Sequence, residues 1–372
     1  MLKYVLIIGA IILIIAALAV GFFKWSGTSN PDYVRKLLQK ETVRSSIVFK
    51  ENAETKINMD SSEMMGLAST VKLMVAMEYA FQFGEGKIDS QERINLQELN
   101  KYYIPNLDGG AHEAWLNDAD KKNLIENDTV PIREAARGMM AFSSNANTEF
   151  LLDRLEIEQI EKRMKAIGIK EHSPLHYFTS SIFIPYEIKL REYQDTSMND
   201  AKKDIIKHIN NMDDKEWAAL SSDIHEKLAS NAQYKEKANV LDWWNEDYDR
   251  IQSERFIKST ASEYADFMSK VNNKQFPEKV QAELEYLLGS LMDNPANQEW
   301  LERAGKKGGS TMYIITDALF AEDKQGNKFE LAIFFNELEW YQSRKLMASL
   351  NEFELKLLND PSIRDDMYEL LN

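Results

Sequence analysis

The sequence predicts an α+β fold in which an antiparallel sheet flanked by helices packs beside an all-helical lobe. Two observations carry this prediction. Runs with the alternating pattern of strands lie near both ends of the chain, and the long middle of the chain has helical periodicity. Strands near both ends of a domain pair most simply into one antiparallel sheet. The 372 residues provide ample core for one large or two modest domains.

The chain begins with a hydrophobic segment. Residues 4–23 are apolar without interruption and are bracketed by Lys3 and Lys24, and a bilayer-spanning helix needs about 20 such residues. Residues 17–19 (Ala-Leu-Ala) also fit the cleavage pattern of a signal peptide, but the apolar run continues beyond them, which favours an uncleaved transmembrane anchor. The flanking basic residues do not decide its orientation, because large domains translocate largely regardless of them. Residues 24–30 are predicted to be a polar linker that lifts the domain off the membrane.

Residues 31–372 are predicted to form the folded domain. Its α/β part comprises about residues 31–62 and 290–372, and its helical lobe comprises about residues 63–289. Within the lobe, about residues 195–258 are strongly charged and mostly helical in pattern, with no repeat and no low-complexity run. We therefore interpret this stretch as an inserted helical layer rather than a disordered linker.

The elements of the domain follow from local patterns of apolar residues. Helical spacing predicts helices over residues 31–42, 70–80, 131–140, 142–155, 259–291 and 341–359. Alternating spacing predicts two hairpins, one over residues 46–59 with its turn at 52–54, and one that joins strands over 310–320 and 328–335. A short polar tail is expected to close the chain.

Composition excludes several classes of function. The net charge of −15, with no basic stripe to offset it, argues against a nucleic-acid partner. The chain has no cysteine, which excludes disulfides, thiolate metal sites and cysteine nucleophiles. Among the five histidines only His172 and His176 are spaced like a ligand pair, and Pro174 between them breaks the helix that would align them. We therefore predict neither a metal nor a cofactor.

Ser69 and Lys72 form the first candidate site. Ser69 stands at the start of the helix predicted over residues 70–80, where serine is favoured as an N-cap, and Lys72 projects from the same face of the first turn. A hydroxyl beside an amine at the positive end of a helix dipole can act as an activated nucleophile. Taken alone, the pair also fits an ordinary helix cap followed by a solvated lysine, so its meaning depends on partners elsewhere.

Two further stretches supply such partners. Ser143-Ser144-Asn145 places hydroxyls and a carboxamide on a turn between two predicted helices, and residues 307–310 (Lys-Gly-Gly-Ser) place a cation and two glycines directly before a predicted strand. Glycines at that place let a substrate backbone approach the strand edge closely. Acyl transfer needs a nucleophile, a proton carrier, a cation for an anionic substrate group and paired donors for the oxyanion. Together the three stretches can supply all four.

The three stretches resemble the signature of the serine β-lactamase and penicillin-binding (DD-peptidase) superfamily, which is Ser-x-x-Lys, then Ser-x-Asn, then Lys-Thr-Gly. The resemblance covers most of the chain after about Ser46. It is closest to class A β-lactamase-like serine hydrolases, because residues 142–155 look like the class A form of the second motif and its helix. The resemblance implies a β-lactamase-like fold.

The resemblance also implies catalytic roles. Ser69 would be the acylated nucleophile, Lys72 would accept its proton, and Ser143 would carry a proton to the leaving nitrogen. A lysine can act as a base only if it is unprotonated part of the time, and an ordinary lysine has a pKa of about 10.4. Burial and a neighbouring cation such as Lys307 would lower the pKa of Lys72 as required.

For substrate binding, the resemblance implies Asn145, Lys307, Gly309 and Ser310. Asn145 would hold the substrate amide, and Lys307 with Ser310 would bind the substrate carboxylate. Gly309 would let the substrate approach the strand, and the backbone N–H groups of Ser69 and Ser310 would form the oxyanion hole.

Two departures from the family pattern affect the expected chemistry. Gly308 stands where the family usually carries Thr or Ser, which removes one hydroxyl from the carboxylate site. Class A β-lactamases also carry a loop Glu that activates the deacylating water. Residues 172–193 correspond to that loop, but they contain no Glu-x-x-Leu-Asn pattern, and Glu187 is a poor substitute on spacing. An acyl-enzyme is therefore expected to persist, as it does in penicillin-binding proteins.

The resulting expectation is a single-pass, membrane-anchored, extracytoplasmic serine hydrolase, secreted if the amino-terminal segment is cleaved. It would act through a Ser69 acyl-enzyme on a β-lactam or a peptidoglycan-type D-Ala-D-Ala peptide, with slow deacylation. Gly308 and the acidic insertion motivate an alternative, a non-catalytic relative that binds cell-wall fragments or a protein partner. A third alternative is an esterase on the same fold. The sequence leaves the substrate, the deacylating base and the oligomeric state open.

Overall fold

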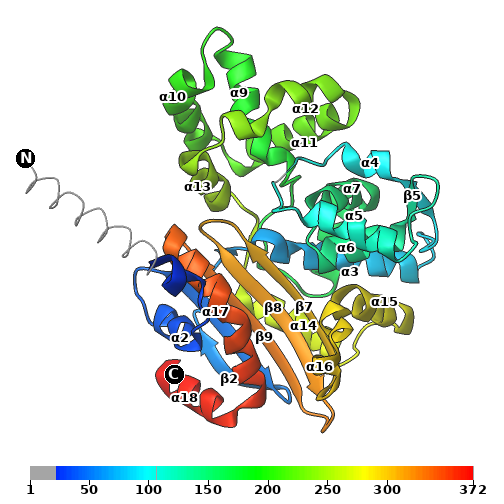
Figure 1. The fold of residues 1–372 in the computed structure, drawn as a ribbon, viewed down its shortest axis with the longest axis vertical. Coiled ribbons are helices and arrows are strands. Elements are labelled where there is room, and N and C mark those ends of the chain that lie inside the picture. The colour runs from blue at the N-terminus through cyan, green and yellow to red at the C-terminus, as the bar shows by residue number, and fades with distance from the viewer. Residues whose placement is uncertain (1–21, 106, 372) are drawn as a thin grey trace, which may run out of the picture.

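Five antiparallel strands form the main sheet of the protein, in the order β2-β1-β9-β8-β7 (Figure 1). The computed structural model describes residues 22–105 and 107–371. Strands from both ends of the chain join this sheet, as the sequence predicts. Their bounds are Arg44–Glu51 (β1), Glu54–Met59 (β2), Leu301–Ser310 (β7), Ile315–Asp323 (β8) and Lys328–Asn336 (β9).

The two predicted hairpins are confirmed in part. The turn between β1 and β2 falls at Asn52 and Ala53, which have φ of 51° and 69°, the backbone of a tight hairpin turn. The second hairpin is wrong at its start, because residues 301–310 form an additional strand, β7, and β8 begins only at Ile315. Charged residues and glycines are depleted in strands, so local preference obscured β7. Its pairing with β8 overrides that preference.

Helices cover both faces of the sheet. Val48, Ala332 and Phe334 point into a core shared with the helical lobe, whereas Ile47 and Ile333 point into a second core. Helix α14 (Ala261–Asn272) packs on the face of the sheet that points to the helical lobe. Helices α2 (Pro31–Leu38) and α17 (Trp340–Asn359) contribute to the second core, on the other face. The predicted polar tail is a further helix, α18 (Pro361–Leu371), because Met367 is fully buried in the second core.

The predicted linker packs against the domain instead of standing free. Residues 22–27 are helical, and the Lys345 amine on α17 donates hydrogen bonds to the carbonyl oxygens of Trp25 and Thr28, at 2.7 and 2.5 Å. The predicted membrane segment, residues 4–23, lies almost entirely outside the described residues. Within residues 22–105 and 107–371, no helix combines the length and hydropathy needed to cross a bilayer.

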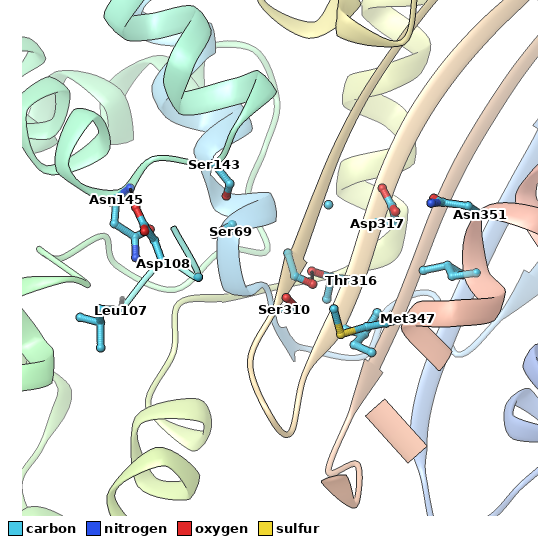
Figure 2. Close-up of a pocket in the computed structure, with 15 residues that line it drawn as sticks. Ser69, Leu107, Asp108, Ser143, Asn145, Ser310, Thr316, Asp317, Met347 and Asn351 are labelled. Carbon is cyan, nitrogen blue, oxygen red and sulfur yellow. Dashed lines mark hydrogen bonds between the residues drawn. The ribbon is translucent and has the colours of Figure 1, made fainter. Parts of the chain in front are cut away.

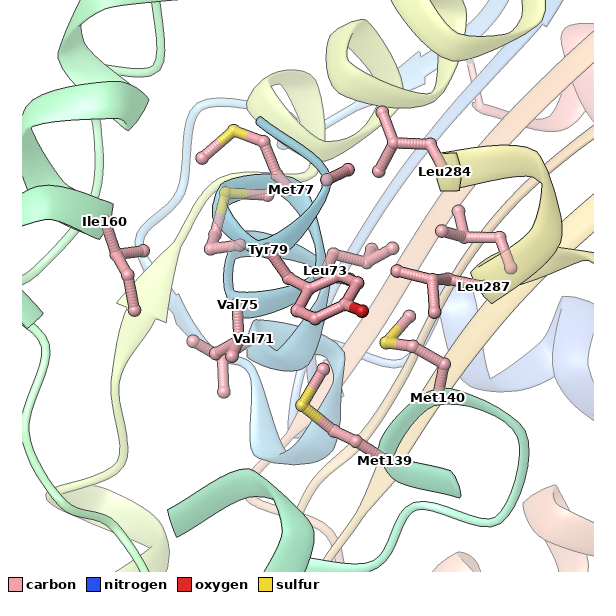
Figure 3. Close-up of a cluster of buried hydrophobic side chains, with 14 of the residues drawn as sticks. Val71, Leu73, Val75, Met77, Tyr79, Met139, Met140, Ile160, Leu284 and Leu287 are labelled. Atoms are coloured by element: carbon pink, nitrogen blue, oxygen red, sulfur yellow. The ribbon is translucent and has the colours of Figure 1, made fainter. Parts of the chain in front are cut away.

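The helical lobe is built around α3 (Lys72–Gly84), whose first nine residues are all buried (Figure 3). The other elements of the lobe are β3 (Met65–Gly66), η1 (Ala68–Val71), β4 (Arg93–Asn95), α4 (Leu96–Asn100), α5 (Ala111–Lys121), β5 (Thr129–Pro131), α6 (Ile132–Ala141), α7 (Asn145–Leu155), α8 (Ile157–Ala166), β6 (Lys258–Ser259) and α15 (Glu278–Leu288). An amphipathic helix would bury only one face, but α15, α7, α8 and α6 all pack against α3. After the lobe, η4 (Gly289–Asp293) and α16 (Pro295–Gln298) pack against β7 of the sheet.

The predicted insertion is a helical layer with its own apolar core, which includes Ile205, Trp217 and Ile224. Figure 1 shows this layer beyond one end of the sheet, and its last helix lies against that end, where the Ser253 and Thr311 hydroxyls are 2.9 Å apart. Its elements are η2 (Ser180–Phe183), α9 (Ile184–Glu192), α10 (Met198–Asn211), α11 (Asp214–Ser230), α12 (Ala232–Ala238), η3 (Val240–Asp242) and α13 (Glu246–Glu254). The layer begins before the predicted insertion of residues 195–258, because η2 and α9 pack into the same apolar core.

Candidate active site

A cleft of about 450 Å³ lies where strand β7 meets the helical lobe (Figure 2). The three stretches singled out in the sequence meet in its wall. The lining includes residues from each of them, namely Ser69, Ser143, Asn145, Gly308, Gly309 and Ser310. The two lysines of the motifs are buried behind this lining, and both reach the Ser143 hydroxyl.

Ser69 lies in the single turn of 3₁₀ helix η1, not at the helix N-cap that the sequence predicted. α3 begins only at Lys72, and its N-cap residue, Val71, makes no side-chain capping bond. Ala68 has a φ of +44°, in the left-handed region, which costs a non-glycine residue on the order of 1 kcal/mol. The tertiary structure therefore holds Ala68 in a strained conformation, and the residue after it, Ser69, lines the cleft.

The Ser69 turn is pressed against the sheet. The Thr316 hydroxyl donates to the Leu67 carbonyl at 2.6 Å and lies 2.8 Å from the Thr70 hydroxyl. A Cβ atom placed on Gly309 would lie 2.5 Å from the Ser69 nitrogen, which is closer than non-bonded atoms approach. Gly309 does allow a close approach, but the segment that approaches it is the Ser69 turn of the protein itself.

The second motif forms the turn before α7. Ser143 has a φ of +70°, again in the left-handed region. Ser144 is fully buried, accepts a hydrogen bond from the Asn147 backbone at 3.2 Å and bonds to His112 Nδ1 at 2.8 Å. Ser144 is thus the helix cap, which leaves Ser143 and Asn145 on either side of it to line the cleft.

Lys72 is completely buried and bonds to the second motif. Its amine donates to the Ser143 carbonyl and to Asn145 Oδ1, both at 2.7 Å, and lies 3.2 Å from the Ser143 hydroxyl. Burial, and then the charge of Lys307, hold the pKa of Lys72 well below its usual value, which is the condition that the role implied by the resemblance sets. A neutral amine has two N–H donors and one lone pair. The two N–H donors match the Ser143 carbonyl oxygen and Asn145 Oδ1, and the lone pair can accept from the Ser143 hydroxyl.

Lys307 also reaches the Ser143 hydroxyl. Its amine lies 3.0 Å from the Ser143 hydroxyl and 2.7 Å from the Gly308 carbonyl oxygen. Burial, with a contribution from the charge of Lys306, lowers the pKa of Lys307 to about 8, although Asp317 partly offsets the shift. One hydroxyl is therefore held between two lysines with lowered pKa values, an arrangement suited to relaying a proton.

The loop that corresponds to the class A Glu loop brings an aromatic ring, not a carboxylate, to Lys72. The centroid of the Phe178 ring is 5.9 Å from the Lys72 amine. Glu149, fully buried on α7, anchors this loop by accepting hydrogen bonds from Thr179 N at 2.8 Å and Ser180 Oγ at 2.7 Å. Glu187 is ion-paired with Lys227 and Arg191 in the inserted layer and does not line the cleft.

The sequence prediction missed Asp108. This residue lines the cleft, and its carboxylate accepts hydrogen bonds from the backbone N–H groups of Ala111 and His112 at the start of α5, at 3.1 and 3.2 Å. Two glycines follow Asp108 in the sequence, a pattern that favours a turn but does not by itself indicate a site. Only the packing of that turn over α7 brings Asp108 beside the motifs.

Gly308 opens the cleft toward the next strand. It pairs with Asp317 on β8, and a Cβ atom at position 308 would lie 3.4 Å from the Asp317 carboxylate. Asp317 and Asn351 line this part of the cleft (Figure 2). Position 308 therefore lacks the hydroxyl of the family pattern, and the space beside Gly308 borders the Asp317 carboxylate.

The histidines have other partners. His172 bonds to the Ser173 carbonyl at 2.7 Å, and His176 accepts a hydrogen bond from the Trp217 indole at 3.4 Å. In the described part of the chain, no group of three or more His, Asp or Glu side chains has a metal-binding arrangement.

Comparison with known proteins agrees with this geometry. The family model described as "Beta-lactamase enzyme family" matches residues 31–350, which is most of the chain. The chain belongs to this family. The resemblance to the serine β-lactamase and penicillin-binding superfamily is thereby confirmed, and no curated protein matches the chain.

Solved structures share the β-lactamase fold with this family member at low sequence identity. A class A β-lactamase from Bacteroides cellulosilyticus is 14% identical, with a TM-score of 0.50, and 92% of this chain and 96% of that one are covered. A chromosome-encoded β-lactamase of Vibrio parahaemolyticus is 10% identical, with a TM-score of 0.53 and coverage of 89% and 100%. A β-lactamase from Chitinophaga pinensis is 11% identical, with a TM-score of 0.51 and coverage of 87% and 98%. These similarities show the β-lactamase-like α+β fold.

Proposed function

We propose that this β-lactamase family member is a membrane-anchored, extracytoplasmic serine hydrolase that forms an acyl-enzyme through Ser69. Its substrate is a β-lactam or a D-Ala-D-Ala-type peptide. The observation that carries the proposal is the convergence of two buried lysines on the Ser143 hydroxyl, at 3.2 and 3.0 Å, in the wall of a cleft that Ser69 also lines. The apolar run over residues 4–23 supports the anchoring.

Acylation uses the low pKa of Lys72. Neutral Lys72 accepts the proton of the Ser69 hydroxyl while the Ser69 oxygen bonds to the substrate carbonyl carbon. Backbone N–H groups of Ser69 and Ser310 stabilise the developing oxyanion. Ser143 then donates its proton to the leaving nitrogen as the C–N bond breaks, and protonated Lys72 returns a proton to Ser143. The lysine is regenerated, and the acyl group stays on Ser69.

Substrate binding relies on groups that surround this centre. Lys307 and Ser310 hold the substrate carboxylate, and Asn145 holds the substrate amide. The charged form of Lys307 favours an anionic ligand, and burial strengthens that attraction because the local dielectric is low.

Slow deacylation is the second half of the proposal. A water that attacks the acyl-enzyme needs a base, and the loop carries Phe178 beside Lys72. Glu149 behind the loop is fully buried and bonded to Thr179 and Ser180. These contacts support an acyl-enzyme that accumulates, as in penicillin-binding proteins.

Labelling with a reporter penicillin tests the proposal. Intact-mass analysis after incubation is expected to show a stoichiometric adduct that Ser69→Ala abolishes, with a rapid burst and slow turnover. The neighbouring Ser144→Ala is the matched control, because it removes a buried capping hydroxyl outside the cleft lining and should retain the adduct. Absence of an adduct with every β-lactam tested would contradict the proposed acylation.

A specific contact pattern favours a second candidate, a non-catalytic relative that binds cell-wall fragments. All three hydrogen bonds of the Lys72 amine go to Ser143 and Asn145 rather than to Ser69. If that arrangement persists with ligand bound, Lys72 only stabilises the turn. Binding of muropeptides that survives Ser69→Ala, without turnover, would support this function. Turnover of short-chain aryl esters alone would instead indicate an esterase.

A further inference from the structure

An apolar surface surrounds the point where the described chain begins. We call it the apolar face, and it consists of exposed Phe23, Trp25, Met312, Trp340 and Met347, whose exposed fractions are 53%, 42%, 45%, 48% and 56%. Large apolar side chains that cluster on a surface usually mark an interaction site.

The beginning of the chain is firmly attached to this face. The Phe22 ring packs against the Trp340 ring at 5.4 Å between centroids and against Trp25 at 5.7 Å. The Arg344 guanidinium lies 5.3 Å from the centroid of the Phe23 ring. Because Phe23 is the last residue of the apolar run over residues 4–23, the end of that run is fixed on the apolar face.

A groove continues from this face to the inserted helical layer. Its volume is about 970 Å³, and Met312, Trp340 and Met347 line it together with Trp244 of the inserted layer. The remaining lining is polar and carries Glu246 and Asp249 on the side of the inserted layer and Arg344 on α17, with Asn245, Thr311 and Ser343 between them. Met347 also lines the cleft that contains Ser69. The apolar groove and the candidate active site are therefore neighbours.

We propose that the apolar face lies in the interfacial region of a lipid bilayer, so that the cleft opens beside the membrane and serves membrane-tethered substrates. The proposal rests on the membrane anchoring in the proposed function. The reason is geometric: if residues 4–23 span a bilayer, Phe22 and Phe23 lie at its edge, and Trp340 lies against them. Trp and other amphipathic side chains are enriched at that depth.

Two cations at the edge of the apolar face agree with this occupant, whereas the carboxylates of Glu246 and Asp249 lie across the groove on the inserted layer. Lys24 directly follows the apolar run and is exposed, and Arg344 lies over Phe23. Cations with long stems reach lipid headgroups from such positions. Trp340 and Met347 are seven residues apart on α17, a rise of about 10 Å. A peptide held near the headgroups can therefore reach the cleft, whereas the predicted polar linker would have held the domain away from the bilayer.

The absence of cysteine in the chain makes the proposal directly testable. Single variants Met312→Cys, Met347→Cys, Lys24→Cys and Leu355→Cys are labelled with an environment-sensitive fluorophore in the full chain and reconstituted into phosphatidylcholine–phosphatidylglycerol vesicles that carry a nitroxide-labelled lipid. Leu355 is the matched control because it is an exposed apolar residue of α17, 46% accessible, and lies about 22 Å along the helix from Trp340.

We expect the lipid quencher to reduce the fluorescence of labels at positions 312 and 347 at least twofold, close to its effect at position 24. The label at position 355 should keep its intensity. Quenching at position 24 alone would overturn the apolar-face proposal and leave the anchor intact. No quenching at position 24 would overturn both the anchor and this proposal. Labels at 312 and 347 that are shielded from aqueous iodide but unaffected by the lipid quencher would indicate a second copy of the chain and overturn the proposal.

The same variants separate this inference from the proposed chemistry. The penicillin adduct on Ser69 is measured in Met312→Cys, whose side chain is not part of the cleft lining. Lipid quenching without an adduct would leave the membrane face standing and contradict the acylation. An adduct without quenching would do the reverse.

Discussion

Lys306 and Lys307 are adjacent on β7, yet they lie in opposite environments. The Lys306 side chain points toward α17, where its amine is 2.7 Å from Asp317 and 2.5 Å from Glu354. The Lys307 side chain points to the helical lobe, where its amine meets the Ser143 hydroxyl. Burial disfavours the charge of both amines, but the two carboxylates outweigh it and raise the pKa of Lys306, whereas the pKa of Lys307 falls to about 8.

The two faces of β7 therefore have different roles. One face contributes a paired cation that joins the strand to α17, and the other contributes an unpaired cation to the cleft. The glycines of the motif divide in the same way, because Gly309 lies against the Ser69 turn and Gly308 lies beside Asp317. Burial alone therefore does not determine what a lysine does; the partners on its face of the strand decide.

The largest effect is expected at Lys72, which lies on the same side of β7 as the Lys307 amine, toward the helical lobe. Replacing Lys72 by Met removes the proposed proton acceptor, and loss of a general base typically slows a reaction by about 10²–10⁴-fold. The rate constant for penicillin acylation of Ser69, from time-resolved mass analysis, measures the effect. Unchanged acylation in Lys72→Met would show that another group takes the proton.

The next largest effect is a difference in stability between variants of Lys306 and Lys307. Lys306→Met leaves Asp317 and Glu354 without their cation, and breaking a buried ion pair costs about 3–5 kcal/mol. Lys307→Met is the matched control, because its amine has no carboxylate within ion-pair distance among the described residues. Urea unfolding should show a much larger loss in Lys306→Met than in the control. An equal loss of unfolding free energy in the two variants would contradict the different roles of the two lysines.

The glycine on the lobe face should also be sensitive. Gly309→Ala puts a Cβ atom 2.5 Å from the Ser69 nitrogen, and overpacking of this kind costs about 1–3 kcal/mol. Since the Ser69 turn must move to relieve the contact, acylation should slow as well. Urea unfolding and the acylation rate measure the two effects. Wild-type values for both would mean that the turn is more adaptable than its contacts indicate.

The pH dependence of acylation should report both lobe-facing lysines. The rate is expected to rise as Lys72 loses its proton, at a pH below the usual lysine range, and to fall above about pH 8 as Lys307 loses the charge that attracts the substrate. Lys307→Met should abolish the alkaline fall. It should also move the rising limb to higher pH, because removing the cation raises the pKa of Lys72. An unchanged alkaline limb would exclude Lys307 as its source.

The smallest effect is expected at the other glycine. Gly308→Thr restores the family hydroxyl, and its Cβ atom meets Asp317 at 3.4 Å, a contact that a small adjustment relieves. A hydrogen bond to a charged group contributes about 1.5 kcal/mol, so penicillin affinity should improve about tenfold with stability nearly unchanged. Competition binding measures the change. Weaker binding would show that the open space beside Asp317 is itself part of the ligand site.

Local patterns predicted much of the fold and the site. The helix spacing over residues 31–42 and 341–359, the hairpin around 52–54 and the three short motifs all depend on neighbours in the sequence. The helical pattern of residues 195–258 followed from their periodicity. Burial of Lys72 was only a condition of the catalytic role that the resemblance implies, and the structure shows that Lys72 is buried. The polar tail and the start of the second hairpin were wrong, because burial of Met367 and pairing of β7 with β8 depend on distant residues.

The sequence by itself determined the chemistry that the protein can contain: a serine and a lysine one helical turn apart, a Ser-x-Asn turn, a lysine before two glycines, and no cysteine. The tertiary structure decided which of these groups meet. A one-residue change of register exchanges the faces of a strand, so only the pairing of β7 with β8 assigns Lys307 to the cleft and Lys306 to α17. The packing of residues 22–30 on α17 likewise replaced the predicted linker with a fixed attachment.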